Sequence, residues 1–347
     1  MALGGTLSPP ITELDSENII VGDIAGPNST FGTSTLFYDT QYFTTGPLPV
    51  ADNSGYLKNA TDTLQTRFEF YTDAAEIQVK VERSDSNIHF KVDGVTALVV
   101  DTGSYAERLY TFKFPSMRNR KVEIFGTSFG FGGVYVEGVD LYSVWPILDR
   151  ATKPLLGVMT DSYGIAPTAD SSYGQSFVEY LAEKMGVDVW SDSIDSTGWA
   201  SIGSSLTTTR AAHMATLETN PNYIFGAMGF NDKLETEGDI KAGINDWYDD
   251  IIVAFPYAEI VVAGPWFPEG TDAALADINT WVSEEAASLG ITYIDLSDIF
   301  NTVNKSLYIS TDNVHPNDLG HQFLANRIDV KLKGVGAFEL LDLVGIT

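Results

Sequence analysis

The hydrophobic residues of this chain change their period near residue 150, and this change most constrains what the chain can fold into. Before it, apolar and polar residues alternate in short runs that clusters of Asp, Gly, Asn and Ser separate. These runs are residues 67–72, 76–82, 87–94, 108–114, 121–126 and 133–142. Alternation in segments rich in Val, Ile, Tyr and Phe is typical of strands. Many short strands without a helical stretch predict an all-β domain, an antiparallel sandwich or jelly roll, over residues 1–150.

Beyond a short predicted linker at residues 144–154, strands and helices alternate. The predicted strands are residues 155–160, 188–193, 223–229, 259–264 and 291–296. A helix is predicted over residues 173–186, where Gly186 suits the position just after a helix end. Such alternation predicts a second domain, residues 151–347, built as a parallel sheet with helices on both faces.

Charge and cysteine content exclude several classes of function. The 347 residues carry a formal net charge of −27 and contain no cysteine. A strongly negative field repels polyanions, so we expect neither nucleic acid nor an anionic membrane as a partner. The absence of cysteine excludes disulfides, a thiolate nucleophile and cysteine-ligated zinc. No segment approaches the ~20 apolar residues of a membrane helix, and the first ten residues show no signal peptide.

Polar residues follow four of the predicted strands. They are Asp161-Ser162, residues 193–201, Asn231-Asp232 and residues 311–315. Ligands of parallel α/β sheets bind at the carboxyl ends of the strands. We therefore expect the chemistry of the chain in these four segments.

Activation of a serine at neutral pH usually requires a histidine base. Of the four histidines, His89 lies in an alternating strand, typical of a surface or satisfied residue, and His213 lies in mid-helix, which favours a structural role. His321 lies one helical turn beyond Asn317, which favours solvent contact or packing. His315 lies in a loop three residues after Asp312, whose carboxylate can reach the imidazole Nδ1 atom. The alternative interpretation of this spacing is an Asx-turn followed by proline.

Acyl transfer also requires donors to a developing oxyanion. The side-chain amide of Asn231 follows a buried strand, and Gly229 permits an unusual backbone conformation there. Backbone N–H groups of Ser162 and of residues 195–198 can complete the set. The alternative for Asn231-Asp232 is helix or turn capping.

Together, and in this order, these segments resemble the SGNH, or GDSL-type, hydrolase superfamily. The four blocks of that family correspond here to TDSY (160–163), DSTGW (195–199), GFND (229–232) and DNVH (312–315). The resemblance covers residues 154–333 and implies a flavodoxin-like sheet. Thr160 stands where the family has glycine. In the second block Gly198 is the glycine, while another register puts Ser196 at the donating position.

The layout of the chain is similar to that of carbohydrate esterases with an N-terminal β jelly roll, a domain that could contact carbohydrate. The resemblance implies a serine esterase that removes O-acetyl groups from a polysaccharide or oligosaccharide, acting outside a cell or on a virion. Ser162 would be the nucleophile, His315 the base and Asp312 its partner. Backbone N–H groups of Ser162 and of Gly198 or Ser196, with the Asn231 amide, would bind the oxyanion. No metal or organic cofactor is needed.

Three aromatic residues just after predicted strands are candidates for stacking on sugar rings. They are Trp199, Trp266 and Phe267. The alternative is ordinary packing beneath a loop. Two other functions remain open: a lipase or general esterase on the same fold, and a carbohydrate-binding or viral tail protein without activity.

Overall fold

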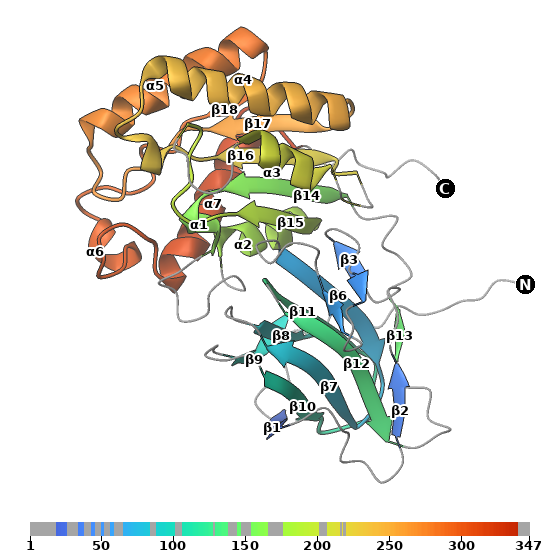
Figure 1. The fold of residues 1–347 in the computed structure, drawn as a ribbon. Helices are drawn as coiled ribbons and strands as arrows, with labels where there is room; N and C mark the ends of the chain where they lie inside the picture. The colour runs from blue at the N-terminus through green and yellow to red at the C-terminus, as the bar shows by residue number, and fades with distance from the viewer. Residues whose placement is uncertain are drawn as a thin grey trace, which may run out of the picture.

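The chain folds into an antiparallel β part followed by an α/β part (Figure 1). The computed structural model describes residues 19–25, 34–37, 43–45, 50–51, 56–58, 65–83, 88–100, 106–127, 129–137, 144–146, 154–165, 176–200, 207–215, 217 and 220–338. The predicted linker, residues 144–154, lies mostly outside them.

Two antiparallel sheets form a β sandwich in the N-terminal part. Its strands are β1 (Ile20–Ala25), β2 (Ser34–Phe37), β3 (Phe43–Thr45), β4 (Val50–Ala51), β5 (Leu57–Lys58), β6 (Gln65–Thr72), β7 (Glu76–Arg83), β8 (Ile88–Val92), β9 (Val95–Val100), β10 (Ala106–Lys113), β11 (Arg120–Thr127), β12 (Gly130–Glu137) and β13 (Trp145–Pro146). One sheet has the order β1-β10-β7-β12-β5-β4, with β2 beside β12. The other has the order β13-β6-β11-β8-β9, with β3 beside β6. The predicted sandwich is confirmed.

The second sheet of the sandwich has an apolar and a charged face. Phe68 and Phe70 of β6 lie in the core between the sheets, as do their neighbours on β11 and β8. The alternate residues, such as Arg67 and Glu69, point away from that core, because successive side chains of a strand face opposite sides. They are nevertheless buried.

A five-stranded parallel sheet with the order β15-β14-β16-β17-β18 forms the centre of the C-terminal part. Its strands are β14 (Leu155–Thr160), β15 (Asp188–Ser193), β16 (Tyr223–Ala227), β17 (Glu259–Ala263) and β18 (Thr292–Ile294). Numbered along this part, the order is 2-1-3-4-5, that of flavodoxin-like folds. The predicted fold class is therefore confirmed, although the fifth strand is shorter than predicted.

Helices cover both faces of the parallel sheet. They are α1 (Ser162–Ile165), α2 (Phe177–Met185), α3 (Thr207–Met214), α4 (Glu237–Ala254), α5 (Ala273–Leu289), α6 (Lys305–Tyr308) and α7 (Asp318–Gly334), with a short 3-10 helix at Phe230–Asp232. Helix α2 ends as predicted at Gly186, whose φ of 67° places it in the left-handed region.

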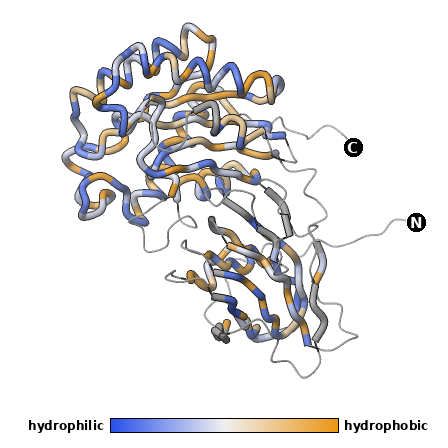
Figure 2. Tube along the Cα trace, in the orientation of Figure 1, coloured by the Kyte–Doolittle hydropathy of each residue, from blue (hydrophilic) through white to orange (hydrophobic). Residues whose placement is uncertain are grey.

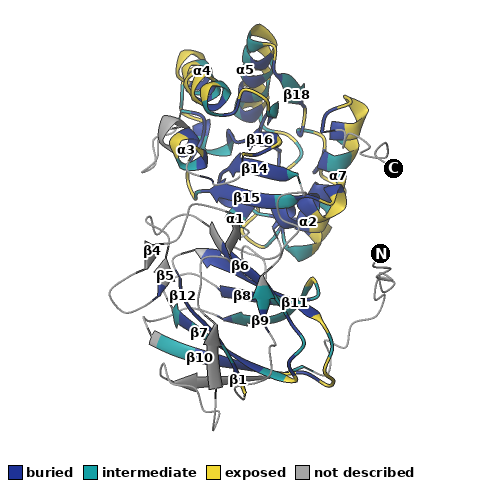
Figure 3. Ribbon diagram, turned by 90° about the vertical axis from the view of Figure 1, so that its right-hand side faces the viewer, coloured by how far each residue is buried: buried dark blue, intermediate teal, exposed yellow. Residues whose placement is uncertain are grey.

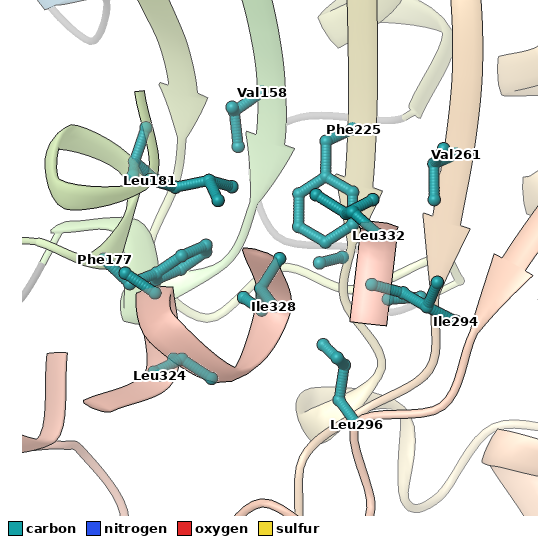
Figure 4. Packing of buried hydrophobic residues seen from close by; sticks show 14 of the residues in the cluster. Val158, Phe177, Leu181, Phe225, Val261, Ile294, Leu296, Leu324, Ile328 and Leu332 are labelled. Carbon is teal, nitrogen blue, oxygen red and sulfur yellow. The ribbon is translucent and has the colours of Figure 1, made fainter. Parts of the chain in front are cut away.

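Two hydrophobic clusters join these helices to the sheet. Figure 4 shows the first, where α2 and α7 pack on Val158, Phe225 and Val261 of the sheet. The second joins α3, α4 and α5 to the opposite face. Figure 2 shows the same division, with hydrophobic residues along the central strands and mixed hydropathy along the outer helices. Both clusters lie below the carboxyl ends of the strands and hold those ends in place.

The two parts meet along β15, α2 and the charged face of the sandwich (Figure 3). Arg67 of β6 donates a hydrogen bond of 2.5 Å to Glu179 of α2, and both side chains are buried. Among the described residues, no helix is both long and apolar enough to cross a membrane.

Candidate active site

Ser162 lies just after the carboxyl end of strand β14 and is the first residue of helix α1. Thr160 ends the strand and Ser162 begins α1. Asp161 between them turns the chain, because its side chain accepts the N–H of Tyr163 at 3.1 Å and its carbonyl accepts the N–H of Gly164. The hydroxyl of Ser162, in a residue 5% exposed, lies 2.8 Å from Nε2 of His315.

His315 lies in the loop between α6 and α7, which a small antiparallel bridge closes. Ile309 pairs with Pro316, and the N–H of Ser310 donates to the carbonyl of His315 at 2.8 Å. Nδ1 of His315 lies 2.6 Å from Oδ2 of Asp312. The structure therefore joins Ser162, His315 and Asp312 in one hydrogen-bonded chain.

The carboxylate of Asp312 is held in its ionised form. Partial burial raises the pKa of Asp312, but several hydrogen bonds together lower it well below its ordinary value of 3.8. Oδ1 accepts from the hydroxyl of Ser310 at 2.6 Å and from the N–H groups of Val314 and His315 at 2.9 and 3.0 Å. A carboxylate anchored in this way can orient the imidazole and stabilise its charged form.

Tyr163 supports the same loop from below, a contact that the sequence reasoning missed. Its hydroxyl donates to the carbonyl of Val314 at 2.5 Å, and its ring centroid lies 5.4 Å from that of His315. The ring is fully buried against Trp266, at 4.3 Å. An aromatic residue after the Asp-Ser pair was visible in the sequence, but nothing there indicated its contact 151 residues away.

Asn231 and Asp232 both bind the segment 194–200 that follows β15. The side-chain amide of Asn231 donates to the carbonyl of Thr197 at 2.8 Å. The buried carboxylate of Asp232 accepts the N–H groups of Trp199 and Ala200 at 2.7 and 3.1 Å. Within the described residues, no side-chain hydrogen bond caps the N-terminus of the 3-10 helix Phe230–Asp232, which begins after Gly229. Gly229, with a φ of 123°, uses the unusual conformation expected of it.

The two candidate donors of the second block differ in surroundings. Ser196 is exposed at the tip of the turn, with a φ of 59°. Gly198 is buried, and a Cβ atom there would lie 2.2 Å from Oδ1 of Asp232. Close approach to a carboxylate thus requires glycine at position 198.

Burial of Asp161 changes its ionisation. Loss of solvent raises the pKa of Asp161 to about 7, and the negative charge of Asp232 acts in the same direction. The hydrogen bond from the N–H of Tyr163 and the positive charge of Arg210 act against this rise. Burial therefore favours the protonated form of a carboxyl group that directly precedes the candidate nucleophile.

The three aromatic residues predicted to stack on sugar rings are buried in this structure, which favours the alternative of packing beneath a loop. Trp199 and Trp266 are each 2% exposed and Phe267 is 7% exposed. Trp199 packs edge-on against Trp247 of α4, and Trp266 packs against Tyr163 and Phe177. All three belong to the hydrophobic core, because the aromatic side chains after these strands turn inward.

The other histidines lie away from the hydroxyl of Ser162. His89 is buried in the sandwich, and His213 on α3 lies 3.4 Å from the carboxylate of Asp192. His321 is buried and its Nδ1 accepts the N–H of Phe177 at 3.2 Å, so packing is its role and not solvent contact. Burial lowers the pKa of His321 to about 3, which keeps it neutral. Within the described residues, no group of three or more His, Asp and Glu residues is arranged to hold a metal ion.

Comparison with known proteins gives a family match for part of the chain and a fold for most of it. Residues 159–323 match the sequence profile of the GDSL-like lipase/acylhydrolase family. No curated protein sequence matches the chain significantly. A family two carbohydrate esterase from Clostridium thermocellum, in complex with cellohexaose, superposes with a TM-score of 0.67 at 13% identity, over 88% of this chain and 100% of the other.

Two further solved structures share the whole architecture. A salicylyl-acyltransferase from a tetracycline biosynthetic pathway superposes with a TM-score of 0.66 at 16% identity, over 93% of this chain and 99% of the other. An acetyl xylan esterase from the rumen bacterium Butyrivibrio proteoclasticus gives 0.58 at 13% identity, over 92% and 100%. The likeness therefore extends across both the sandwich and the α/β part.

Proposed function

We propose that this chain, whose residues 159–323 match the GDSL-like lipase/acylhydrolase family, is a serine esterase of the SGNH type that removes O-acetyl groups from a polysaccharide or oligosaccharide. The observation that carries the proposal is the pair of short contacts of His315. Its Nε2 lies 2.8 Å from the hydroxyl of Ser162, and its Nδ1 lies 2.6 Å from the carboxylate of Asp312.

In the first half-reaction Ser162 attacks the ester carbonyl carbon through Oγ, while Nε2 of His315 takes the hydroxyl proton. The carbonyl oxygen gains the negative charge of the tetrahedral intermediate. When the C–O bond to the sugar breaks, the imidazolium returns its proton to the departing alcohol. Asp312 holds the tautomer that this exchange needs and stabilises the charged imidazole.

In the second half-reaction water attacks the acetyl group on Ser162. His315 accepts the proton of the water and then gives it to Oγ of Ser162 as acetate leaves. The proposed donors to the oxyanion are the N–H groups of Ser162 and Gly198 and the side-chain amide of Asn231. Fixed donors of this kind are worth roughly 10²–10³ in rate each.

A neutral, small acyl ester on a carbohydrate fits the rest of the chain. The net charge of −27 disfavours anionic substrates. Structures of similar architecture belong to a carbohydrate esterase in complex with cellohexaose and to an acetyl xylan esterase. We assign the sandwich, residues 1–150, as a domain that contacts the carbohydrate chain, and residues 151–347 as the hydrolase domain. We therefore expect the activity outside a cell or on a virion.

The test compares 4-nitrophenyl acetate with 4-nitrophenyl palmitate, and then measures acetate released from acetylated xylan. We expect turnover of the acetate ester and of the polysaccharide, and none of the palmitate. Ser162→Ala should abolish turnover, whereas Ser288→Ala on the exposed end of α5 should not. Turnover of palmitate would indicate a lipase, and a folded protein without turnover would indicate a binding protein.

A further inference from the structure

Arg210 is a buried arginine beneath the candidate active site. It lies on α3 and is 1% exposed. One terminal nitrogen donates to the carbonyl of Thr160 at 2.6 Å and to the carbonyl of Asp192. The other donates to the hydroxyl of Thr197 at 3.0 Å. A single guanidinium thus binds the ends of β14 and β15 and the segment 194–200.

These acceptors lie next to Ser162 and in the segment 194–200, which carry the proposed oxyanion donors. Thr160 immediately precedes Asp161 and Ser162, and its carbonyl also accepts the N–H of Ile194 at 3.1 Å. The hydroxyl of Thr197 donates to the carbonyl of Ile194 at 2.7 Å. Arg210 therefore closes a small network that ties the turn of the nucleophile to the start of the segment 194–200.

The same network continues to the side chain of Asn231. Thr197 accepts Arg210 at its hydroxyl and the amide of Asn231 at its carbonyl, 2.8 Å away. Asp232 holds the far end of the segment through Trp199 and Ala200. The segment 194–200 is consequently fixed from both ends, by Arg210 and by Asp232.

Burying a guanidinium is unfavourable unless the charge is paired and its donors are used. Asp192 supplies the opposite charge, with its Oδ2 atom 3.5 Å from Nε of Arg210. An apolar residue could fill the same volume without this need. The planar guanidinium, with its several donors, is required only if several acceptors must be held in one fixed arrangement. The single ammonium group of lysine cannot hold them in this way.

We propose that Arg210 is a positioning residue that keeps the backbone of Ser162 and the segment 194–200 in mutual register, so that their N–H groups address the same oxyanion. The inference rests on the proposed esterase function for its kinetic consequence. Its structural consequence, that Arg210 holds the segment 194–200 immobile, does not depend on the esterase function.

The variant that tests it is Arg210→Lys, with Arg120→Lys as the matched control. Arg120 is 2% exposed and also donates to backbone carbonyls, those of Arg118 at 2.9 Å and Ser116 at 2.6 Å, but it lies in the sandwich. Both variants should lower the melting temperature. Only Arg210→Lys should lower kcat for 4-nitrophenyl acetate, by roughly 10²-fold with KM almost unchanged, because small misplacements of reacting groups are that costly.

A double-mutant cycle with Asn231→Ala separates positioning from general destabilisation. If Arg210 acts through Thr197 and Asn231, Arg210→Lys should lower kcat by a smaller factor in the Asn231→Ala background than in the wild type. Equal factors in the two backgrounds would overturn the proposal. Thr197→Val, which removes the acceptor hydroxyl and keeps the volume, should reproduce part of the loss in kcat.

Amide hydrogen exchange gives a readout that needs no turnover. Arg210→Lys and Thr197→Val should speed exchange in peptides that cover residues 194–200, and Arg120→Lys should not. Unchanged exchange there would overturn the proposal whatever the kinetics. If the wild type shows no Ser162-dependent hydrolysis but exchange still increases, the esterase function is wrong and the positioning by Arg210 stands.

Discussion

Oδ2 of Asp312 lies 2.6 Å from Nδ1 of His315, and Oδ1 of the same carboxylate accepts three further hydrogen bonds. The carboxylate is therefore fixed before it meets the imidazole. All four bonding groups, on Ser310, Val314 and His315, lie on the loop that carries His315 itself, so the spacing of three residues between Asp312 and His315 is a requirement of the geometry.

Asp312→Asn should leave the fold intact and lower kcat by roughly 10⁴-fold, because an amide favours the wrong imidazole tautomer and cannot stabilise the imidazolium. KM for 4-nitrophenyl acetate should change little. Asp298→Asn is the control, since that carboxylate is exposed and bonds only Lys331 and Arg327 in the described structure. Equal kcat values for the two variants would exclude Asp312 from the proposed triad.

Gly198→Ala and Ser196→Ala distinguish the two registers of the second block. A Cβ atom at position 198 would lie 2.2 Å from Oδ1 of Asp232, so the segment must shift. Overpacking of this kind costs about 1–3 kcal/mol. We expect Gly198→Ala to lower both the melting temperature and kcat, and Ser196→Ala to leave kcat within about twofold of the wild type, since the Ser196 side chain is exposed. The reverse order of effects would favour the Ser196 register.

Asn231→Ala tests the oxyanion assignment apart from the triad. Its amide bonds the carbonyl of Thr197, so its loss removes both a proposed oxyanion donor and a support of the segment 194–200. We expect kcat to fall by roughly 10²–10³-fold with KM nearly constant. The matched control is Asn222→Ala, which removes a side chain that accepts the N–H of Leu155 at 3.0 Å, at the opposite end of the sheet. If Asn231 is only structural, both variants should lose about 1 kcal/mol of stability and keep their rate.

How far the sequence could predict this architecture depends on which signals are periodic. Two patterns predict the fold classes well: the alternation before residue 150 and the strand–helix order after it. Each is a strong signal because its burial pattern repeats over several elements. The positions of Ser162, Asn231 and His315 followed from a rule about strand ends. That rule predicted three groups at one edge, and the structure brings them to that edge.

Other features could not be predicted because they depend on where a single side chain turns. Trp199, Trp266 and Phe267 follow strands, and nothing in their spacing distinguished a rim from a core position. Arg210 stands in a polar helical segment, TTTRAAHM, where an arginine is usually solvated. Its burial arises from the ends of β14 and β15 above it, which are distant in sequence.

Arg67→Met tests whether the sandwich and the α/β part unfold as one unit. It would remove the arginine that pairs with Glu179 of α2 and with Glu69 and Glu123 of the sandwich, and breaking a buried ion pair costs about 3–5 kcal/mol. We expect the melting temperature to fall by roughly 6–10 °C. Lys113→Met, which breaks an exposed pair with Glu76 at 3.2 Å, should change it by roughly 2 °C or less. Calorimetry of the wild type should give one transition. Two separate transitions would contradict a firm interface.

His89 should make the folded protein sensitive to mild acid. Its side chain is fully buried on β8, stacked on Phe125 with ring centroids 5.1 Å apart. Neither ring nitrogen has a hydrogen-bond partner among the described residues. Burial lowers the pKa of His89 to about 4, with Lys91 acting in the same direction and Glu179 against it.

Between pH 4 and 6.5 the unfolded chain therefore binds more protons at His89 than the folded one, so stability is lost as the pH falls through this range. At about 1.4 kcal/mol per pKa unit, the loss approaches roughly 3 kcal/mol at the acid end. His89→Phe should keep the stacking and remove the proton site. We expect its melting temperature to fall less than that of the wild type between pH 7 and pH 4.5. The buried His321 and Asp161 titrate in both proteins, so their contributions cancel in the comparison. An equal fall in melting temperature for the two proteins would show that protonation of His89 does not cause the loss of stability.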